Sequence, residues 1–484
     1  MSAEVLFIGL DLGTGGVRAV AVTAAGEVVA SGTATLTGQA VQEGWHEQEP
    51  EMWWQATGAA MQVLGRELEE RGVSAAACVA VAVDGTSGTL VCVDNEGRAL
   101  RPAIMYNDQR AEAEAAEVTA RAGVFCEKLG YTIGGSFAAA RIRWIQLHEP
   151  AVFETTRWFL HQADFIANRL TGQFGVADYS NALKTGYDLV DECWPDWWSA
   201  FDGVSERLPR VLAPGTPLGP LQEEVAGALG LPAGVMVVSG ATDGTAGFLA
   251  SGAHRVGDDN TTLGTTLVFK RLADRLAQDA TGLIYSHKLP GGFWLPGAAS
   301  NTGGEWIRRD YEDADLAQLD AQASRILPSQ HLAYPLARSG ERFPFKVAQA
   351  AGFCLPQAQD TLGHYAAHLQ GVALTERLGY EVLDRIATVP QGDIYATGAA
   401  SRSDAWLQLR ADVSGRKIHR PGCPESAFGS AVLAAAALQF DDVWGAVQSM
   451  VHIDRTFVPD ANRAASYDEL YQKFKGLLAE RGYL

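Results

Sequence analysis

The first residues that could carry chemistry form a carboxylate followed by glycine and hydroxyl groups. Asp11 ends an apolar run and precedes the turn Gly13-Thr14-Gly15-Gly16. A carboxylate at a strand end can hold Mg²⁺ or its waters, and bare glycine N–H groups beside a threonine hydroxyl can bond phosphate oxygens. Glycine also permits the positive φ angles of a tight hairpin, so a purely structural β-hairpin is the alternative. The stretch predicts strand, turn and strand, with a phosphate site at the turn.

The same arrangement returns at Asp84. This residue follows the apolar stretch 76–83 and is followed by Gly85-Thr86-Ser87-Gly88-Thr89, which is not the G-x-S-x-G elbow of serine hydrolases. Carboxylates accept and hydroxyls donate or accept hydrogen bonds, as sugar hydroxyls require. We expect contact with a polyol here, and a structural turn is the alternative.

The sequence contains a third carboxylate beside glycines and a second glycine-threonine turn. Asp243 lies between Gly240 and Gly244 at the start of a small-residue helix, where a backbone or a ligand can come close. About 250 residues after the first turn, Gly264-Thr265-Thr266 again separates two apolar runs. This echo predicts an internal duplication, with domains 1–250 and 251–484. The small residues Gly398-Ala399-Ala400-Ser401 after a strand leave a slot that could seat a flat adenine.

Strands and helices alternate along the chain, which predicts an α/β fold. Apolar residues recur at helical spacing from Pro50 to Gly72, and residues 28–36 are expected to form a strand. His364 and His368 have the i, i+4 spacing of metal ligands, but no third ligand lies nearby in the sequence. We therefore expect these histidines to be structural.

Composition limits the possible partners. The chain has 484 residues and a net charge of −19, from 57 acidic and 38 basic side chains, which repels nucleic acid phosphates. The six cysteines have no C-x-x-C spacing, and no apolar run is long enough for a membrane helix. The N-terminus lacks the basic region of a signal peptide. We expect a cytoplasmic protein that binds neither nucleic acid nor a membrane, with a homodimer left open.

The D-x-G-T turn at Asp11 resembles the first phosphate loop of the superfamily of actin, sugar kinases and heat-shock chaperones. The chain contains no G-x-x-x-x-G-K-[ST] sequence, and the first turn lacks the third glycine of G-x-G-x-x-G. Taken with Gly44-Trp45 to Trp53-Trp54, Leu263-Gly-Thr-Thr, Gly240-Ala-Thr-Asp-Gly and Ala396-Thr-Gly-Ala-Ala-Ser-Arg402, the loops resemble those of the FGGY family of carbohydrate kinases over nearly the whole chain.

The resemblance implies a two-domain, actin-like ATPase fold. Each half would have a ribonuclease-H-like α/β core with a mixed sheet flanked by helices, and the active site would lie in the interdomain cleft. It further implies that ATP and Mg²⁺ are the cofactors and that the γ-phosphoryl group moves to a terminal sugar hydroxyl. In this reading the first lobe binds sugar and carries the catalytic group, and the second lobe binds the nucleotide.

The resemblance also implies roles for individual residues. Asp243 would be the catalytic base, with a helix N-cap as its structural alternative, and both Asp11 and Asp243 would contact the metal. The expected sugar contacts are Asp84, Gly85, Thr86, Asp108 and Asp243. The expected nucleotide contacts are Asp11, Gly13, Thr14, Gly15, Gly264, Thr265, Thr266, Gly398, Ala399 and Ser401.

The chain departs from common xylulose kinases of the family at the second turn. Those enzymes have Ser-Gly-Gln-Met-His-Gly where this chain has Asp84-Gly-Thr-Ser-Gly-Thr, a departure that is similar to a D-ribulose branch. The expected substrate is therefore a ketopentose, D-ribulose or D-xylulose. The alternatives are a kinase for glycerol or a pentitol, a non-catalytic nucleotide- or sugar-binding regulator on the same scaffold, and a chaperone-like ATPase.

Overall fold

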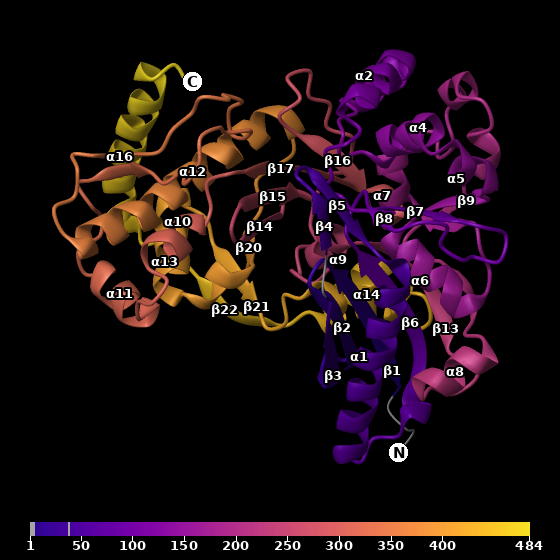
Figure 1. Ribbon diagram of the computed structural model, residues 1–484. Helices are drawn as coiled ribbons and strands as arrows, with labels where there is room; N and C mark the ends of the chain where they lie inside the picture. Colours follow the sequence, from indigo (N-terminus) through magenta and orange to yellow (C-terminus); the bar gives the residue numbers. More distant parts are fainter. Residues whose placement is uncertain (1–4, 37–38) are drawn as a thin grey trace. The chain divides into compact units, whose positions relative to one another are not determined.

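The computed structural model describes residues 5–36 and 39–484, and the chain forms two compact units. The first unit comprises the chain up to residue 250 together with residues 287–293 and 425–452. The second comprises residues 251–286, 294–424 and 453–484. Both units combine sheets with helices (Figure 1).

A mixed sheet forms the centre of the first unit. Its strand order is β12 (Pro217–Pro220), β13 (Met236–Thr242), β6 (Cys78–Gly85), β1 (Leu6–Gly13), β2 (Gly16–Thr23) and β3 (Val28–Thr35). Strands β1, β6 and β13 run parallel, and β2 is antiparallel to both β1 and β3. Smaller sheets contain β4 (Gln39–Gln42), β5 (Trp45–Gln48), β8 (Ala103–Ile104), β7 (Leu90–Val93) and β9 (Trp158–His161), and β10 (Val176–Asp178) with β11 (Arg210–Leu212).

Helices of the first unit come from both ends of the chain. They are α1 (Pro50–Glu70), α2 (Glu112–Arg121), α3 (Gly123–Leu129), α4 (Ala138–His148), α5 (Pro150–Thr155), α6 (Gln162–Thr171), α7 (Tyr179–Ala182), α8 (Glu223–Leu229), α9 (Asp243–Leu249), α14 (Ser426–Ala436) and α15 (Val443–Met450). The expected helix from Pro50 is confirmed by α1, and the strand expected over 28–36 is β3.

Alternation along β1 places a different helix on each face of this sheet. Leu6, Ile8, Leu10 and Leu12 share a buried cluster with Trp53, Met61, Leu64 and Leu68 of α1, which runs along β2 and β3 (Figure 1). On the other face, a Cβ on Gly9 would lie 1.8 Å from the carbonyl oxygen of Ala427 in α14. Only glycine permits that approach, and Asp11 has the same parity as Gly9, so it faces α14.

The second unit repeats the strand order of the first. Its sheet has the order β16 (Tyr285–Lys288), β17 (Trp294–Ser300), β15 (Leu267–Arg271), β14 (Asp259–Leu263), β20 (Ile394–Thr397), β21 (Ile418–Pro421) and β22 (Ile453–Phe457). Strands β17-β15-β14-β20-β21 match β3-β2-β1-β6-β13 in order and direction. In both sheets the first two strands form a hairpin at the expected glycine turn. The predicted ribonuclease-H-like duplication is confirmed.

Five α-helices and a small sheet also belong to the described part of the second unit. They are α10 (Glu305–Asp310), α11 (Leu316–Ala323), α12 (Thr361–Ala387), α13 (Asp404–Ser414) and α16 (Ala461–Glu480), with β18 (Leu332–Tyr334) paired to β19 (Phe353–Leu355). No helix in residues 5–36 and 39–484 has the length and apolar character needed to cross a bilayer.

The units differ from the expected lobes 1–250 and 251–484 in two segments. Residues 287–293 and 425–452 belong to the first unit although they follow residue 250. Packing explains the longer segment, because small residues of α14 let it lie directly on β1 and on α9. A Cβ on Gly429, for example, would lie 1.9 Å from the carbonyl oxygen of Ala246.

Candidate active site

Three carboxylates meet at one edge of the first unit's sheet. Asp11 and Asp84 are register partners on the parallel strands β1 and β6. Ala241 of β13 pairs with Asp84, and Asp243 follows two residues later as the first residue of α9. The carboxyl ends of parallel strands meet at the same edge of a sheet, which is where ligands bind in open α/β sheets. The three acids singled out in the sequence thus share one edge.

Asp84 is the most buried of these acids, with a fully inaccessible side chain. Its Oδ2 accepts a hydrogen bond of 2.6 Å from Ser430, while its Oδ1 has no partner within the described part of the chain. Burial and the neighbouring charge of Asp11 raise the pKa of Asp84 well above its ordinary value. Burial also raises the pKa of Asp11. The nearby Asp11 carboxylate thus disfavours the charged form of Asp84.

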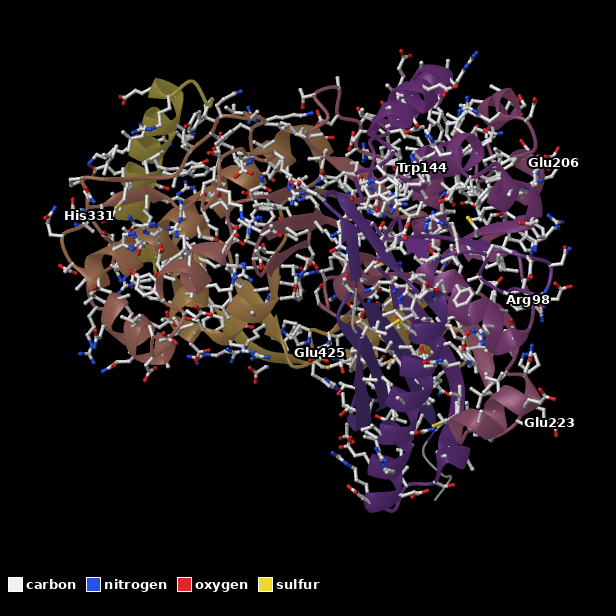
Figure 2. All side chains as sticks on the ribbon, viewed as in Figure 1. Arg98, Trp144, Glu206, Glu223, His331 and Glu425 are labelled. Atoms are coloured by element: carbon white, nitrogen blue, oxygen red, sulfur yellow. The ribbon has the colours of Figure 1, made fainter. Side chains whose placement is uncertain are left out.

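A cation lies beside Asp11. Arg18, the register partner of Asp11 on β2, places Nη1 3.7 Å from Oδ2 of Asp11 and Nε 3.4 Å from Glu425. Glu425, labelled in Figure 2, is the residue before α14. Arg18 was not among the site residues predicted from the sequence. The length of the turn could have predicted this residue, because a two-residue turn fixes the strand register and therefore the residue opposite Asp11.

Asp243 is not the N-cap of its helix. Thr242 holds that position, and its hydroxyl accepts from the backbone N–H of Thr245. The structural alternative proposed for Asp243 is therefore wrong. Oδ1 of Asp243 accepts from the N–H of Gly244 at 2.6 Å, and the Ser426 hydroxyl donates to the Asp243 carbonyl at 3.0 Å. Helix α14 thus contacts both Asp84 and Asp243, through serines that had no signal in the sequence.

The other expected sugar contacts have partners within the protein. Thr86 is buried and its hydroxyl bonds Gln162 at 2.7 Å. Asp108 is buried, and its carboxylate accepts from both the Arg110 guanidinium and the N–H of His46. These bonds, with the Arg110 charge, hold the pKa of Asp108 below its ordinary value despite burial. Contact of Gly85, Thr86 or Asp108 with a sugar stays a prediction.

Aromatic side chains brace the Asp108 network. The Arg110 guanidinium lies 3.9 Å from the ring centre of Trp45 and 5.0 Å from that of Trp144. The two tryptophan rings meet edge to face at 5.5 Å, and Trp144 is labelled in Figure 2. This explains the early Gly-Trp signature in structural terms: Trp45 helps to hold Arg110 against Asp108.

In the second unit, the Gly264-Thr265-Thr266 turn lies against the start of α10. The N–H of Gly304 donates to the Gly264 carbonyl at 2.8 Å. A Cβ on Gly303 would lie 2.4 Å from the Thr265 carbonyl oxygen, so glycine is needed for this approach. The Gly13–Gly16 turn of the first unit also has a side-chain partner, because Gln48 donates a hydrogen bond of 2.9 Å to the Thr14 carbonyl.

A cavity of about 740 Å³ adjoins this turn. Its lining includes Gly264 and Thr265 together with Ala399 and Ala400 of the 3₁₀ helix Ala399–Arg402, so two expected nucleotide loops share one cavity. Gly398 has φ of 85°, and a Cβ there would lie 2.6 Å from the Leu263 carbonyl oxygen. Gly398 therefore lets the second loop pass directly over the end of β14.

The donor set at the acidic edge suits a magnesium ion brought by a nucleotide. Mg²⁺ binds through one or two carboxylates, substrate phosphates and waters, and rarely uses a cage made by protein alone. Within residues 5–36 and 39–484 no group of three or more His, Cys, Asp or Glu side chains is arranged as a metal cage. The ring centres of His364 and His368 lie 3.9 Å apart with their planes tilted by 32°. Nδ1 of His364 bonds the Tyr311 hydroxyl, and Nδ1 of His368 bonds the His364 carbonyl.

Comparison with known proteins agrees with this geometry. The models of the N-terminal and C-terminal domains of the FGGY family of carbohydrate kinases match residues 6–250 and 260–438. A xylulose kinase of Escherichia coli (strain K12) is 30% identical over 483 residues, covering 98% of each chain. A xylulose kinase structure from Rhodospirillum rubrum has a TM-score of 0.87 at 29% identity, covering 98% of each chain.

A second solved structure gives the same result. A kinase from Brucella ovis, described as a xyloylose kinase, has a TM-score of 0.88 at 26% identity and covers 99% of each chain. These likenesses and the two matching sheets confirm the predicted two-domain, actin-like ATPase fold.

Proposed function

The chain belongs to the FGGY family of carbohydrate kinases, and on that premise we propose that it transfers the γ-phosphoryl group of ATP to the terminal hydroxyl of a ketopentose. The observation that carries this proposal is the position of Asp243. It begins α9 at the edge where β1, β6 and β13 end, beside Asp11 and Asp84. Thr242 already caps α9, so the Asp243 side chain is not needed for capping.

In the proposed mechanism Asp243 accepts the proton of the attacking sugar hydroxyl. A carboxylate within hydrogen-bond reach can act as general base in this way. The hydroxyl oxygen then bonds to the γ-phosphorus, the bond to the β-phosphate oxygen breaks, and ADP leaves. Asp84 keeps the edge in place through Ser430, and the Arg18 cation offsets charge at Asp11.

Asp11 and Asp243 are the proposed protein contacts of Mg²⁺, which when bound offsets negative charge on the phosphate oxygens. The backbone N–H groups and hydroxyls of Gly13, Thr14 and Gly15, and of Gly264, Thr265 and Thr266, are the proposed phosphate partners. Donors already aimed at the phosphates stabilise charge in the transition state without further rearrangement.

The cavity beside Gly264 is the proposed seat of the nucleoside. Gly398, Ala399 and Ser401 belong to the loop at its margin, and Ala399 with Ala400 gives it a flat, small-residue wall. The sugar would bind in the first unit and the nucleotide in the second, as expected for lobes 1–250 and 251–484. The cytoplasm is the proposed location.

A ketopentose is the proposed substrate class because the Escherichia coli relative and the Rhodospirillum rubrum structure reported above are both named xylulose kinases. The Asp84 turn differs from the Ser-Gly-Gln-Met-His-Gly sequence expected of common xylulose kinases, and Oδ2 of Asp84 accepts a hydrogen bond from Ser430. D-Xylulose and D-ribulose differ in the configuration of one hydroxyl, so a hydrogen-bonding site can separate them. Glycerol, pentitols and sugar-independent nucleotide binding are the competing outcomes.

The test is ADP release by the full chain with MgATP and a panel of D-xylulose, D-ribulose, glycerol, xylitol and ribitol. The proposal expects ADP formation that depends on a ketopentose, with one phosphate on the terminal carbon of the product by ³¹P NMR. Preference for glycerol or a pentitol would show that the substrate is not a ketopentose. Sugar-independent hydrolysis, or binding without turnover, would contradict the proposal.

A further inference from the structure

One wall of the cavity in the second unit carries a carboxylate far from the phosphate turn in the sequence. Helix α11 contributes Leu316, Ala317 and Asp320 to the lining, at the i, i+1 and i+4 positions of one helix face. Tyr365 of α12 and Trp406 of α13 line the same cavity. This wall combines apolar surface for a flat ring with a single polar group at its edge.

A buried hydroxyl fixes this carboxylate. The Tyr365 hydroxyl donates to Oδ1 of Asp320 at 2.7 Å, and the Tyr365 side chain is only 1% exposed. The Tyr365 ring meets Trp306 at 5.4 Å and Tyr311 at 5.0 Å, so neighbouring rings hold it in place. Burial and the adjacent Asp320 raise the pKa of Tyr365, which keeps the phenol protonated as a donor.

The other oxygen of this carboxylate is available. Within the described part of the chain, no hydrogen bond reaches Oδ2 of Asp320. Two other carboxylates line the cavity, but Glu305 is paired with Arg338 and the Glu312 side chain is exposed. Asp320 is therefore the lining carboxylate whose Oδ1 is held by a buried partner and whose Oδ2 accepts no hydrogen bond within the described residues.

We propose that Oδ2 of Asp320 accepts a hydrogen bond from the 6-amino group of the purine ring, and so makes the enzyme select adenine over 6-oxopurine nucleotides. The inference rests on the proposed nucleotide site. Adenine presents a donor at position 6, whereas hypoxanthine and guanine present an acceptor there. If O6 of hypoxanthine or guanine faces the Asp320 carboxylate, two acceptors meet and neither has a donor. The carboxylate therefore weakens binding of 6-oxopurines as well as strengthening binding of adenine.

The Tyr365 hydroxyl gives this proposal a directional test. In Asp320→Asn the amide oxygen pairs with the Tyr365 hydroxyl, so the amide NH₂ group turns toward the base. That reverses the hydrogen-bonding pattern from acceptor to donor and matches the O6 atom of hypoxanthine. In the double variant Asp320→Asn/Tyr365→Phe, nothing fixes the amide orientation, and either base can be accommodated.

The experiment compares kcat/KM for ATP, ITP and purine riboside triphosphate, which lacks the 6-amino group. We expect the ATP-to-ITP ratio to fall by about 10- to 100-fold in Asp320→Asn, the range for one hydrogen bond to a charged group. For the wild type, kcat/KM for purine riboside triphosphate should be about 10- to 100-fold lower than for ATP. For Asp320→Asn the two substrates should give similar kcat/KM values, as a double-mutant cycle requires. In Asp320→Asn/Tyr365→Phe the ATP-to-ITP ratio should lie between those of Asp320→Asn and the wild type.

The matched control is Asp315→Asn, which removes the same charge from the residue before α11. Asp315 caps this helix by accepting from the N–H of Gln318 at 3.0 Å, and asparagine caps equally well. The control should keep the wild-type ratio. An unchanged ATP-to-ITP ratio in Asp320→Asn would overturn the inference, and so would a changed ratio of ATP to 2′-deoxy-ATP, because Asp320 would then contact the ribose.

Calorimetric titration with ADP and IDP separates this inference from the proposed function. If the wild type phosphorylates no sugar, the proposed function fails, yet a preference for ADP that is lost in Asp320→Asn still supports the role of Asp320. If sugar is phosphorylated and the variant discriminates as the wild type does, only the inference fails. If neither nucleotide binds, both fail.

Discussion

Ser430 donates a hydrogen bond of 2.6 Å to Asp84, joining residues that are 346 positions apart in the chain. Ser430 lies on α14 and Asp84 near the end of β6, so the bond ties a helix from the last part of the chain to the acidic edge of the first unit. Because Asp84 is the register partner of Asp11, the position of α14 also affects the proposed magnesium contact.

Removal of this bond should weaken the first unit. We expect Ser430→Ala to lower the free energy of unfolding by about 1–3 kcal/mol, since a buried acceptor loses its donor. Urea unfolding followed by circular dichroism measures the change. Ser199→Ala is the control, because its exposed hydroxyl donates only to the carbonyl of Asp196. Equal stability of both variants would show that the Ser430 bond contributes nothing.

The buried histidine beneath the Asp84 turn should make the fold sensitive to acid. His161 is 2% exposed, its Nε2 bonds Thr185 at 2.8 Å, and burial lowers its pKa from 6.5 to about 3. The neutral ring is compatible with the fold above pH 6.5, and this stability is lost as the pH falls toward 3. Relative to His161→Gln, the wild type should therefore lose about 2 kcal/mol between pH 7 and pH 5.

Urea midpoints at both pH values test this expectation. The glutamine variant keeps a neutral partner for Thr185 but cannot take up a proton. His452→Gln, at an exposed histidine, serves as the comparison. The same pH dependence in the wild type and in His161→Gln would mean that His161 is not the group that links acid to unfolding.

The nucleotide loop should be intolerant of a side chain at Gly398. A Cβ there would meet the Leu263 carbonyl oxygen at 2.6 Å, and φ is already 85°. We expect Gly398→Ala to raise the KM for ATP by about tenfold or more, because strain of 1–3 kcal/mol would move the loop. The KM for the sugar should change little.

Gly415→Ala is the control for Gly398→Ala. Gly415 has φ of 68°, but a Cβ there would have no atom within 4 Å. Gly415→Ala therefore carries the cost of a positive φ in the left-handed helical region without the clash. If both alanine variants change the KM for ATP equally, the contact with Leu263 is not what shapes the loop.

Local signals were sufficient to predict much of this fold. Strand, glycine turn and strand at Asp11 and at Gly264 are encoded by neighbouring residues, and their repetition indicated the duplication that the two sheets confirm. The same pattern singled out Asp84, whereas Asp243 was singled out by its place between two glycines at the start of a small-residue helix. Both lie where parallel strands end.

Long-range packing could not be predicted in the same way. The alanine-rich sequence from Ser426 has no spacing that indicates contact with β1, α9 and Asp84. Asp320 lacked a signal as well, because its partner Tyr365 is 45 residues away and on another helix. Such pairs depend on the assembled fold, and a single sequence contains no pattern that joins them.

Phosphoryl transfer by Asp243→Asn tests the central claim most directly. The substitution keeps the size of the side chain and removes its ability to accept a proton, and general-base catalysis is worth about 10²- to 10⁴-fold. The measurement is the rate of ³²P transfer from γ-labelled ATP to the preferred ketopentose, with ADP affinity determined on the same preparation. We predict that kcat falls by about 10³-fold while ADP affinity is preserved. Transfer at the wild-type rate would contradict the account.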